Sequence, residues 1–417
     1  MKRTIFHIDQ NCYFASVEMI SHPELRNVPM AVTGDASNRH GIILAKNDLA
    51  KAAGVKTAEA IWQAEQKCPG LVKVNSHYDS YAFYSMKLRS MYEEYSDKVE
   101  PFGMDECWVD MTDVIGNSDP VELADEIRQR VKTEFKLTCS VGVSFNKVFA
   151  KLGSDYKKPD ATTLITEENF RDIVWPLPAA DLLFVGGKTA SRLSEVNIRT
   201  IGDIARSDRG FLVDYLGKAG DMLWLYSNGL DDSEVTYSEA KRDIKSIGNS
   251  MTTPADMMNR RQAAGTFRKL SASVSSRLRK HGLKGSCVQI SVRDKDLCIY
   301  DHQRMLFEPT DSEKVIYNTA MELFDESYDW SKAIRSVGVR LTKLVPSGSG
   351  IQMSMFPEED RFQEEDPKLV KAIDELNLRF GSGTVKSCAQ LEGRSSRNYD
   401  PEFNDGGITA GKRNPLL

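Results

Sequence analysis

Short strand-like runs alternate with helical stretches through the first 165 residues, and this interleaving constrains the fold most. The runs TIFHID (4–9), ECWVDM (106–111) and CSVGVSF (139–145) have the composition of buried strands. Residues 120–135, between the last two runs, have helical spacing, and helical spacing is also expected over 42–62. Strands interleaved with helices are typical of an α/β or α+β layer and argue against a helix bundle.

The chain is too long for one core, since single cores stop growing near ~250–300 residues. After residues 166–230, which look helical, a polar stretch precedes a second unit. That unit opens with an expected amphipathic helix over 260–280. Two runs with period-2 alternation follow, at 287–294 and 335–344, and predict a small α+β domain.

Composition describes an ordinary globular chain. Hydrophobic residues make up 41% and charged residues 28%. The N-terminus lacks the apolar stretch of a signal peptide, and no run reaches the ~18 apolar residues of a membrane span. The seven cysteines are scattered, with no CxxC pair, so reduced thiols are expected rather than a zinc site or disulfides. We therefore expect a cytoplasmic protein with no membrane partner.

Charge is unevenly distributed along the chain. The whole chain carries a net charge of −5, whereas residues 241–350 hold 19 Lys and Arg against 12 Asp and Glu, a net of +7. A local basic face binds phosphates whatever the total charge is. This pattern predicts contact with nucleic acid in the second half of the chain.

Three acidic residues stand out against apolar surroundings. Asp9 ends a strand-like run, where it is either a helix N-cap or a metal ligand. Asp105 and Glu106 are adjacent, and neighbouring side chains of a regular strand point to opposite faces, so they share a site only at a turn or an irregular strand end. An exposed hairpin tip is the alternative. Buried acids must be paired or bound to metal.

Basic residues gather in SFNKVFAKLGSDYKKPD (144–160). Lys147 and Lys151 are one helical turn apart, and Lys158 precedes Pro159. Such lysines are often no more than a solvated helix end. Together with separated carboxylates, however, they supply what phosphoryl transfer needs: oxygen ligands for Mg²⁺ and cations for a triphosphate.

Three segments in this order resemble the signature motifs of Y-family DNA polymerases: HIDQNCYFASVE (7–18), MDECWVDMT (104–112) and VGVSFNKVFAKLGSDYKKP (141–159). The resemblance extends over about residues 1–357. It implies an α+β multidomain chain with the right-hand polymerase fold. The implied parts are a palm (1–19 and 76–165), fingers (20–75), a helical thumb (166–232), a linker (233–245), an α+β little finger (246–345) and a C-terminal tail (346–417).

The resemblance also implies the catalytic residues. Asp9, Asp105 and Glu106 match the family's metal ligands, and the main-chain carbonyl of Gln10 would add an oxygen, so two Mg²⁺ ions are the expected cofactors. Phe14 falls at the steric-gate position, where an aromatic ring under the sugar excludes a 2′-hydroxyl. The expected nucleotide-binding residues are Tyr13, Phe14, Lys51 and Lys158.

Three positions depart from the family pattern. Asn11 replaces a frequent Asp, and Gly103 replaces the usual Ser before the acidic pair. Asp48 stands where a tyrosine often hydrogen-bonds the triphosphate. An acid facing phosphates is repulsive, so Asp48 is expected to point away or to hold Lys51.

Residues 182–205 resemble a helix-hairpin-helix, although a plain glycine-containing turn is the simpler alternative. Glycines at a helix N-terminus let backbone N–H groups approach a phosphate without reading the base sequence. The 241–345 unit resembles the family's little finger, with strand arginines that would face phosphates. The expected DNA-binding residues are Gly186, Gly187, Lys188, Lys245, Arg335 and Arg340.

The motif QMSMF (352–356), beyond the flexible segment PSGSG (346–350), resembles a peptide that binds the β subunit of the bacterial sliding clamp. Gln352 would be the anchor, and Met355 and Phe356 would enter a hydrophobic pocket.

Taken together, the resemblance implies translesion DNA synthesis by a monomeric nucleotidyltransferase. Its substrates would be primer-template DNA and a dNTP. One rival hypothesis is a catalytically weak or inactive member that serves as a DNA- and clamp-binding scaffold. Another is a nuclease or glycosylase built around the helix-hairpin-helix, which leaves the aromatic corner after Asp9 and the lysine cluster unexplained.

Overall fold

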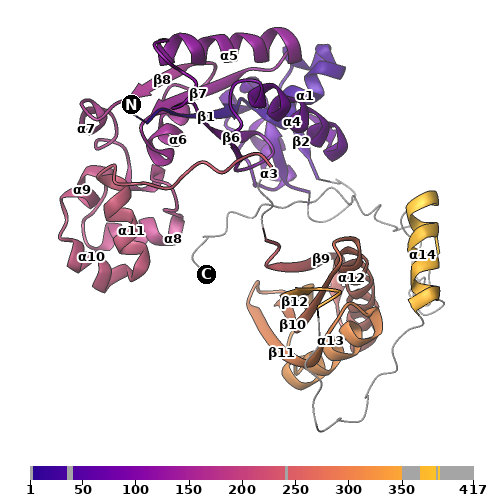
Figure 1. Ribbon diagram of the computed structural model, residues 1–417. Helices are drawn as coiled ribbons and strands as arrows, with labels where there is room; N and C mark the ends of the chain where they lie inside the picture. Colours follow the sequence, from indigo (N-terminus) through magenta and orange to yellow (C-terminus); the bar gives the residue numbers. More distant parts are fainter. Residues whose placement is uncertain (1–2, 35–40, 240–242, 350–366, 382–383, 386–417) are drawn as a thin grey trace. The chain divides into compact units, whose positions relative to one another are not determined.

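The computed structural model describes residues 3–34, 41–239, 243–349, 367–381 and 384–385 (Figure 1). These residues form two compact units, the first ending at residue 239 and the second beginning at residue 243. Among the described helices, none is long and apolar enough to cross a membrane.

A five-stranded sheet lies at the centre of the first unit, with the strand order β5-β6-β1-β7-β8. Its neighbouring strands are antiparallel except for β7 and β8, which are parallel. The strands are β1 (Ile5–Gln10), β5 (Val99–Pro101), β6 (Glu106–Asp110), β7 (Cys139–Ser144) and β8 (Thr162–Ile165).

Helices cover both faces of this sheet. Phe6 and Ile8 of β1 share one core with α1 (Tyr13–Ser21), α4 (Tyr78–Glu93) and α5 (Pro120–Phe135). The α5 bounds confirm the helix predicted at 120–135. The other face, which carries His7, packs on α6 (Lys147–Tyr156). Gly142 of β7 makes this approach possible, because a Cβ there would lie 1.8 Å from the main-chain oxygen of Ala150.

A smaller three-stranded sheet follows α1, with the order β3-β2-β4. The helical expectation for 42–62 is wrong at its start, where residues 43–46 form β3. Ile43 is fully buried and pairs with Thr33, and this tertiary pairing overrides the local spacing. The elements are η1 (Pro23–Asn27), β2 (Met30–Thr33), β3 (Ile43–Lys46), α2 (Asp48–Ala52), α3 (Ile61–Lys67) and β4 (Val72–Asn75).

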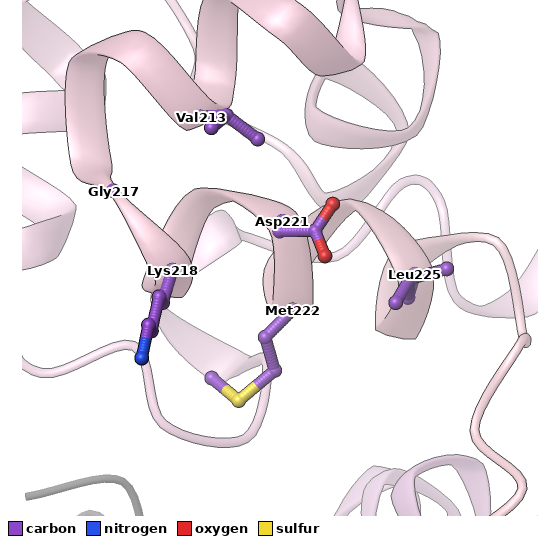
Figure 2. A pocket seen from close by; sticks show the side chains of 6 residues that line it. All are labelled: Val213, Gly217, Lys218, Asp221, Met222 and Leu225. Atoms are coloured by element: carbon purple, nitrogen blue, oxygen red, sulfur yellow. The ribbon is translucent and has the colours of Figure 1, made fainter.

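Short helices make up the remainder of the first unit, as expected for 166–230. They are α7 (Phe170–Ile173), η2 (Ala179–Asp181), α8 (Gly187–Glu195), α9 (Ile201–Arg206), α10 (Arg209–Leu216) and α11 (Lys218–Ser227). Figure 2 shows an open hollow on α10 and α11, lined by Val213, Gly217, Lys218, Asp221, Met222 and Leu225. The carboxylate in this hollow, Asp221, pairs with Arg209 at 2.6 Å, so it is already neutralised.

The second unit is an antiparallel sheet of order β11-β10-β12-β9 with two helices packed on it (Figure 1). Helix α12 has the predicted bounds, and the two predicted strands are present but longer than expected. Helix α14 is tied to α12 by a two-bond ion pair between Arg279 and Asp374, at 2.6 and 2.9 Å. The elements are β9 (Ser246–Met257), α12 (Arg260–Lys280), β10 (Leu283–Asp294), β11 (Ile299–Thr310), α13 (Glu313–Ser327), β12 (Ile334–Pro346) and α14 (Pro367–Phe380).

Candidate active site

The predicted acidic residues lie on or next to two adjacent strands of the five-stranded sheet, β1 and β6. Asp9 on β1 is directly opposite Glu106 on β6. Directly opposite residues of an antiparallel pair point to the same face, so these two carboxylates converge. Asp105 occupies the bend just before β6, and its main-chain oxygen accepts a hydrogen bond from the Gln10 N–H at 2.9 Å. The expectation of an irregular strand end at the acidic pair is therefore confirmed.

Lysines from α6 and the segment after it balance two of the three carboxylates. The Lys158 ammonium lies 2.8 Å from Asp9 and 2.7 Å from Asp155. Lys151 forms an ion pair with Glu106. Within the described residues, no such ion pair reaches Asp105. The site therefore holds two neutralised carboxylates and a third without a cation of its own.

Lys147, one turn before Lys151 on α6, is directed elsewhere. Its ammonium lies 2.8 Å from Glu100 and 4.6 Å from the centre of the Trp108 ring. Of the predicted lysine cluster, Lys151 and Lys158 therefore contact the acidic site, whereas Lys147 forms an ion pair outside it.

The pKa values reflect this uneven balance. Burial, reinforced by the charges of Asp9 and Glu106, raises the pKa of Asp105 to about 6. Burial also raises the pKa of Asp9, although Lys158 opposes the shift. Burial alone would raise the pKa of Glu106 as well, but the hydrogen bond with His7 and the charge of Lys151 outweigh it and lower that pKa to about 2. Uncompensated negative charge is thus concentrated at Asp105.

His7 belongs to this site and was missed in the sequence. It is fully buried, with Nδ1 2.8 Å from Ser154 Oγ and Nε2 3.5 Å from Glu106 Oε2. Its ring meets Trp108 edge-on, with the centroids 5.2 Å apart. The available signal was strand periodicity, because a residue two positions before Asp9 shares its face.

The donor set fits a divalent cation. One ligand atom from each of His7, Asp9 and Glu106 lies within 4.8 Å of the others. Carboxylate oxygens are the ligands that Mg²⁺ prefers, and the raised pKa of Asp105 marks negative charge that a cation would relieve. The side chain of Gln10 is outside this set, since its Nε2 donates to the Tyr92 hydroxyl at 2.9 Å.

An aromatic stack adjoins the acidic residues at the start of α1. Phe14 is half-buried and lies flat on Tyr81 of α4, with ring centroids 4.2 Å apart and planes 11° apart. Tyr78 meets Phe14 edge-on at 5.7 Å. Tyr13 is only 3% exposed, and its hydroxyl donates to the Tyr81 main-chain oxygen at 2.6 Å. The Tyr13 ring therefore supports the stack from within the core.

Asn11, one of the departures from the family pattern, has a defined structural role. Its side-chain amide donates to Ser140 Oγ at 3.0 Å, and its carbonyl accepts the main-chain N–H of Asp160 at 2.9 Å. Asp160 lies two residues after Lys158. Asn11 therefore fastens the loop that carries Lys158 to strand β7.

Asp48 and Lys51 lie on the short helix α2, and both are exposed. Asn47 caps this helix by accepting the Ala50 N–H, so Asp48 occupies the first turn, where an acid is favoured by the helix dipole. The Cys12 thiol donates to Asp48 at 3.8 Å. The described residues show no ion pair between Asp48 and Lys51, so of the two expected arrangements the one in which Asp48 points away from the phosphates stays a prediction.

The predicted helix-hairpin-helix residues lie at the start of α8. Gly186 is its N-cap, Gly187 its first residue and Lys188 its second, and all three are exposed. A Cβ at either glycine would meet no atom within 4 Å. The side-chain positions of both glycines at the start of α8 are therefore open.

The remaining predicted DNA contacts lie in the second unit. Lys245 is exposed just before β9. Arg340 on β12 is opposite Gly248 on β9, and a Cβ on that glycine would lie 2.8 Å from Cβ of Arg340. Arg335 falls at a register shift in the same strand pairing. The predicted clamp-binding residues Gln352, Met355 and Phe356 lie outside the described residues.

Two family models match the chain: the impB/mucB/samB family over residues 8–155, and the C-terminal domain of that family over residues 244–355. The chain belongs to the impB/mucB/samB family. The first match includes all three acidic residues and Lys151, and ends before Lys158.

Relatives and a solved structure agree with this membership of the impB/mucB/samB family. DNA polymerase IV of Acetivibrio thermocellus is 46% identical over 395 residues, which is 94% of this chain and 99% of the relative. DNA polymerase IV 1 of Bacillus subtilis is 36% identical, over 96% of each chain. A solved chimeric Y-family DNA polymerase matches with a TM-score of 0.74 at 24% identity, covering 82% of this chain and 99% of its own. The fold is therefore that of the Y-family polymerases, as predicted.

Proposed function

We propose that this chain is a DNA-directed DNA polymerase that copies template past damaged bases without proofreading. The observation that carries the proposal is the convergence of Asp9 and Glu106 beside Lys158, with Asp105 at the bend just before Glu106, in a member of this family. In the reaction, the 3′-hydroxyl of a primer attacks the α-phosphate of a dNTP paired with the template, and pyrophosphate leaves. Relatives that span almost the whole chain are named DNA polymerase IV, which supports this activity.

Two Mg²⁺ ions are the cofactors that we propose for the acidic site, held by Asp9, Asp105, Glu106 and the main-chain oxygen of Gln10. When bound, they would stabilise the attacking and leaving oxygens of the displacement. Lys158 already contacts Asp9, so its ammonium is positioned to neutralise a phosphate next to the ions. Lys51, exposed on α2, would serve the same triphosphate.

Phe14 is proposed as the gate that selects deoxynucleotides. Its ring is backed by Tyr81 and remains half-exposed on α1, so a sugar that approaches it meets a rigid surface. A 2′-hydroxyl would have no room there. Tyr13, expected to line the nucleotide pocket, is 3% exposed and is proposed to back the Phe14 ring instead, with the two ring centroids 5.8 Å apart.

Primer-template DNA is the proposed macromolecular substrate, bound through phosphates rather than bases. We propose that the palm, fingers, thumb, linker, little finger and tail occupy the residue ranges expected from the sequence. We also retain the monomeric state, a cytoplasmic location and the sliding-clamp peptide at 352–356. The proposed phosphate contacts are Gly186, Gly187, Lys188, Lys245, Arg335 and Arg340.

A catalytically inactive scaffold is the less favoured function, because a chain that no longer catalyses has no need to hold Asp9 and Glu106 together beside Lys158 and Lys151. The decisive experiment is primer extension by Asp105→Ala and by Glu106→Ala, with dNTPs and Mg²⁺. Each should lose roughly a thousand-fold in rate, since stabilisation of the transferring charge is worth several kcal/mol. Asp113→Ala, which alters an exposed ion pair with Lys98, is the matched control. Normal extension by either active-site variant would exclude this assignment.

A further inference from the structure

A further buried carboxylate, Glu18, lies outside the acidic site. Its side chain belongs to α1, the short helix that follows strand β1, and the residue is only 4% exposed. The Tyr81 hydroxyl donates to Glu18 Oε1, and His77 Nδ1 lies 2.9 and 3.1 Å from the two carboxylate oxygens. Buried charges persist when they are paired and hydrogen-bonded. Glu18 therefore has a specific set of partners.

Those partners fix the ring on which Phe14 rests. The Tyr81 hydroxyl donates to Glu18 and accepts the main-chain N–H of His77 at 3.1 Å. At its other end, the Tyr81 main-chain oxygen accepts the Tyr13 hydroxyl at 2.6 Å. Tyr81 is fully buried. A tyrosine held at its hydroxyl and at its main chain has little freedom to tilt.

Helix α1 supplies both the stacked ring and the anchor. Phe14 and Glu18 are four residues apart, so they lie on the same side of the helix, one turn from each other. Tyr81 spans both, stacking on Phe14 at 4.2 Å and bonding to Glu18 through its hydroxyl. A shift of the Tyr81 ring therefore moves the surface that supports Phe14.

We propose that Glu18 is a positioning residue for sugar selection, acting through Tyr81 on the Phe14 ring. This inference rests on the proposed role of Phe14 as the gate. Without the carboxylate, the buried Tyr81 hydroxyl loses its acceptor, and the ring loses the bond that holds its outer end in place. Phe14 then loses its fixed support, and a ribose 2′-hydroxyl finds space that a rigid ring denies.

The test measures single-nucleotide insertion of a dNTP and of the matching rNTP by the full chain, as the ratio of their kcat/KM values. Glu18→Ala should lower the ratio roughly ten-fold, which corresponds to about 1.4 kcal/mol of discrimination. Tyr81→Phe, which keeps the stacking ring but lacks the hydroxyl, should give a similar loss. Glu18→Gln retains an acceptor oxygen and should restore most of the selectivity. Glu24→Ala, an exposed acid soon after α1, is the control.

Two double variants separate positioning from general loss of structure. Glu18→Ala combined with Tyr81→Phe should be little worse than either alone, because both remove the hydrogen bond between Tyr81 and Glu18. In a Phe14→Ala background, Glu18→Ala should change the ratio no further. A normal ratio in Glu18→Ala, or full additivity with Phe14→Ala, would overturn the positioning role. If Phe14→Ala itself keeps normal sugar discrimination, the gate assignment fails instead. Thermal melts of each variant show whether the chain is still folded.

Discussion

The five-stranded and the four-stranded sheet are both mainly antiparallel, but they differ in how they carry polar and charged side chains. The five-stranded sheet is packed on both faces and places Asp9 opposite Glu106, with lysines and a histidine completing the pairs. In the four-stranded sheet, Val288 and Ile290 face the helices, while the alternating position Gln289 lies opposite Arg340. The first sheet buries charge and depends on exact partners. The second carries polar and basic residues on the strand positions that alternate with its core.

Because of this difference, we expect a glycine-to-alanine substitution to destabilise the five-stranded sheet much more than the four-stranded sheet. Gly142→Ala in β7 should destabilise the protein by more than about 3 kcal/mol, because its Cβ would lie 1.8 Å from the Ala150 main-chain oxygen and force α6 away from the sheet. Gly338→Ala in β12 meets Ser250 Cβ at 3.2 Å and should cost less than about 1 kcal/mol. Urea unfolding measures both. Equal losses would remove the proposed contrast between the sheets.

The buried acids should also make stability depend on pH. The pKa of Asp105 is raised to about 6 from 3.8, so the folded state holds its proton more strongly than the unfolded state. Stability of the metal-free protein should therefore fall as pH rises from about 4 to 6, by up to about 3 kcal/mol. Asp105→Asn should remove the larger part of this slope, and Asp9, whose pKa is also raised, should keep the remainder. Glu106 has the opposite sign: its pKa of about 2 contributes stability above pH 4.5 that is lost as pH falls towards 2.

Binding of Mg²⁺ should also affect stability through the Asp105 carboxylate. Mg²⁺ binds the ionised carboxylates of the folded chain, so adding it at pH 7 should raise the melting temperature of the parent protein. The increase should be smaller for Asp105→Asn. Thermal melts with and without Mg²⁺ measure the difference, and an identical increase in both proteins would place the ion elsewhere.

Asn11 tests whether the loop that carries Lys158 needs its tether to β7. Asn11→Ala removes the acceptor for the Asp160 N–H and the donor to Ser140, so the loop should loosen. We expect KM for dNTP to rise about ten-fold, as for the loss of one or two net hydrogen bonds. Asn11→Asp keeps the acceptor and should lose less. Unchanged KM in Asn11→Ala would show that Lys158 is positioned independently of this contact.

The sequence predicted the acidic residues better than their surroundings. Asp9, Asp105 and Glu106 were found because charged residues inside apolar strand-like runs are conspicuous. His7 was missed, since its contacts to Ser154 and Glu106 join residues 147 and 99 positions away. Only the folded sheet brings α6 against β1.

Prediction of helices and strands from local sequence patterns is limited in the same way, because some elements depend on contacts with distant residues. Helix α12 was predicted with its exact bounds because a 21-residue amphipathic pattern is unambiguous. Strands β9 and β11 were not predicted as strands, although each has 12 residues. Their exposed positions include many polar residues, so periodicity is weak there, and pairing with β12 and β10 determines their conformation.

The smallest expected effect concerns the basic positions of the four-stranded sheet. Arg340→Ala should weaken binding to a primer-template a few-fold at low salt and reduce the slope of log affinity against log salt by about one, because one phosphate contact is lost. Arg304→Ala on β11 is the matched control, since Arg304, which pairs with Glu322 and Glu326 of α13, is not among the proposed phosphate contacts. Its salt slope should match that of the parent protein. If the slope falls equally in both variants, the effect comes from the change in net charge and not from a phosphate contact of Arg340. The proposed difference between the two sheets would then be supported by the five-stranded sheet alone.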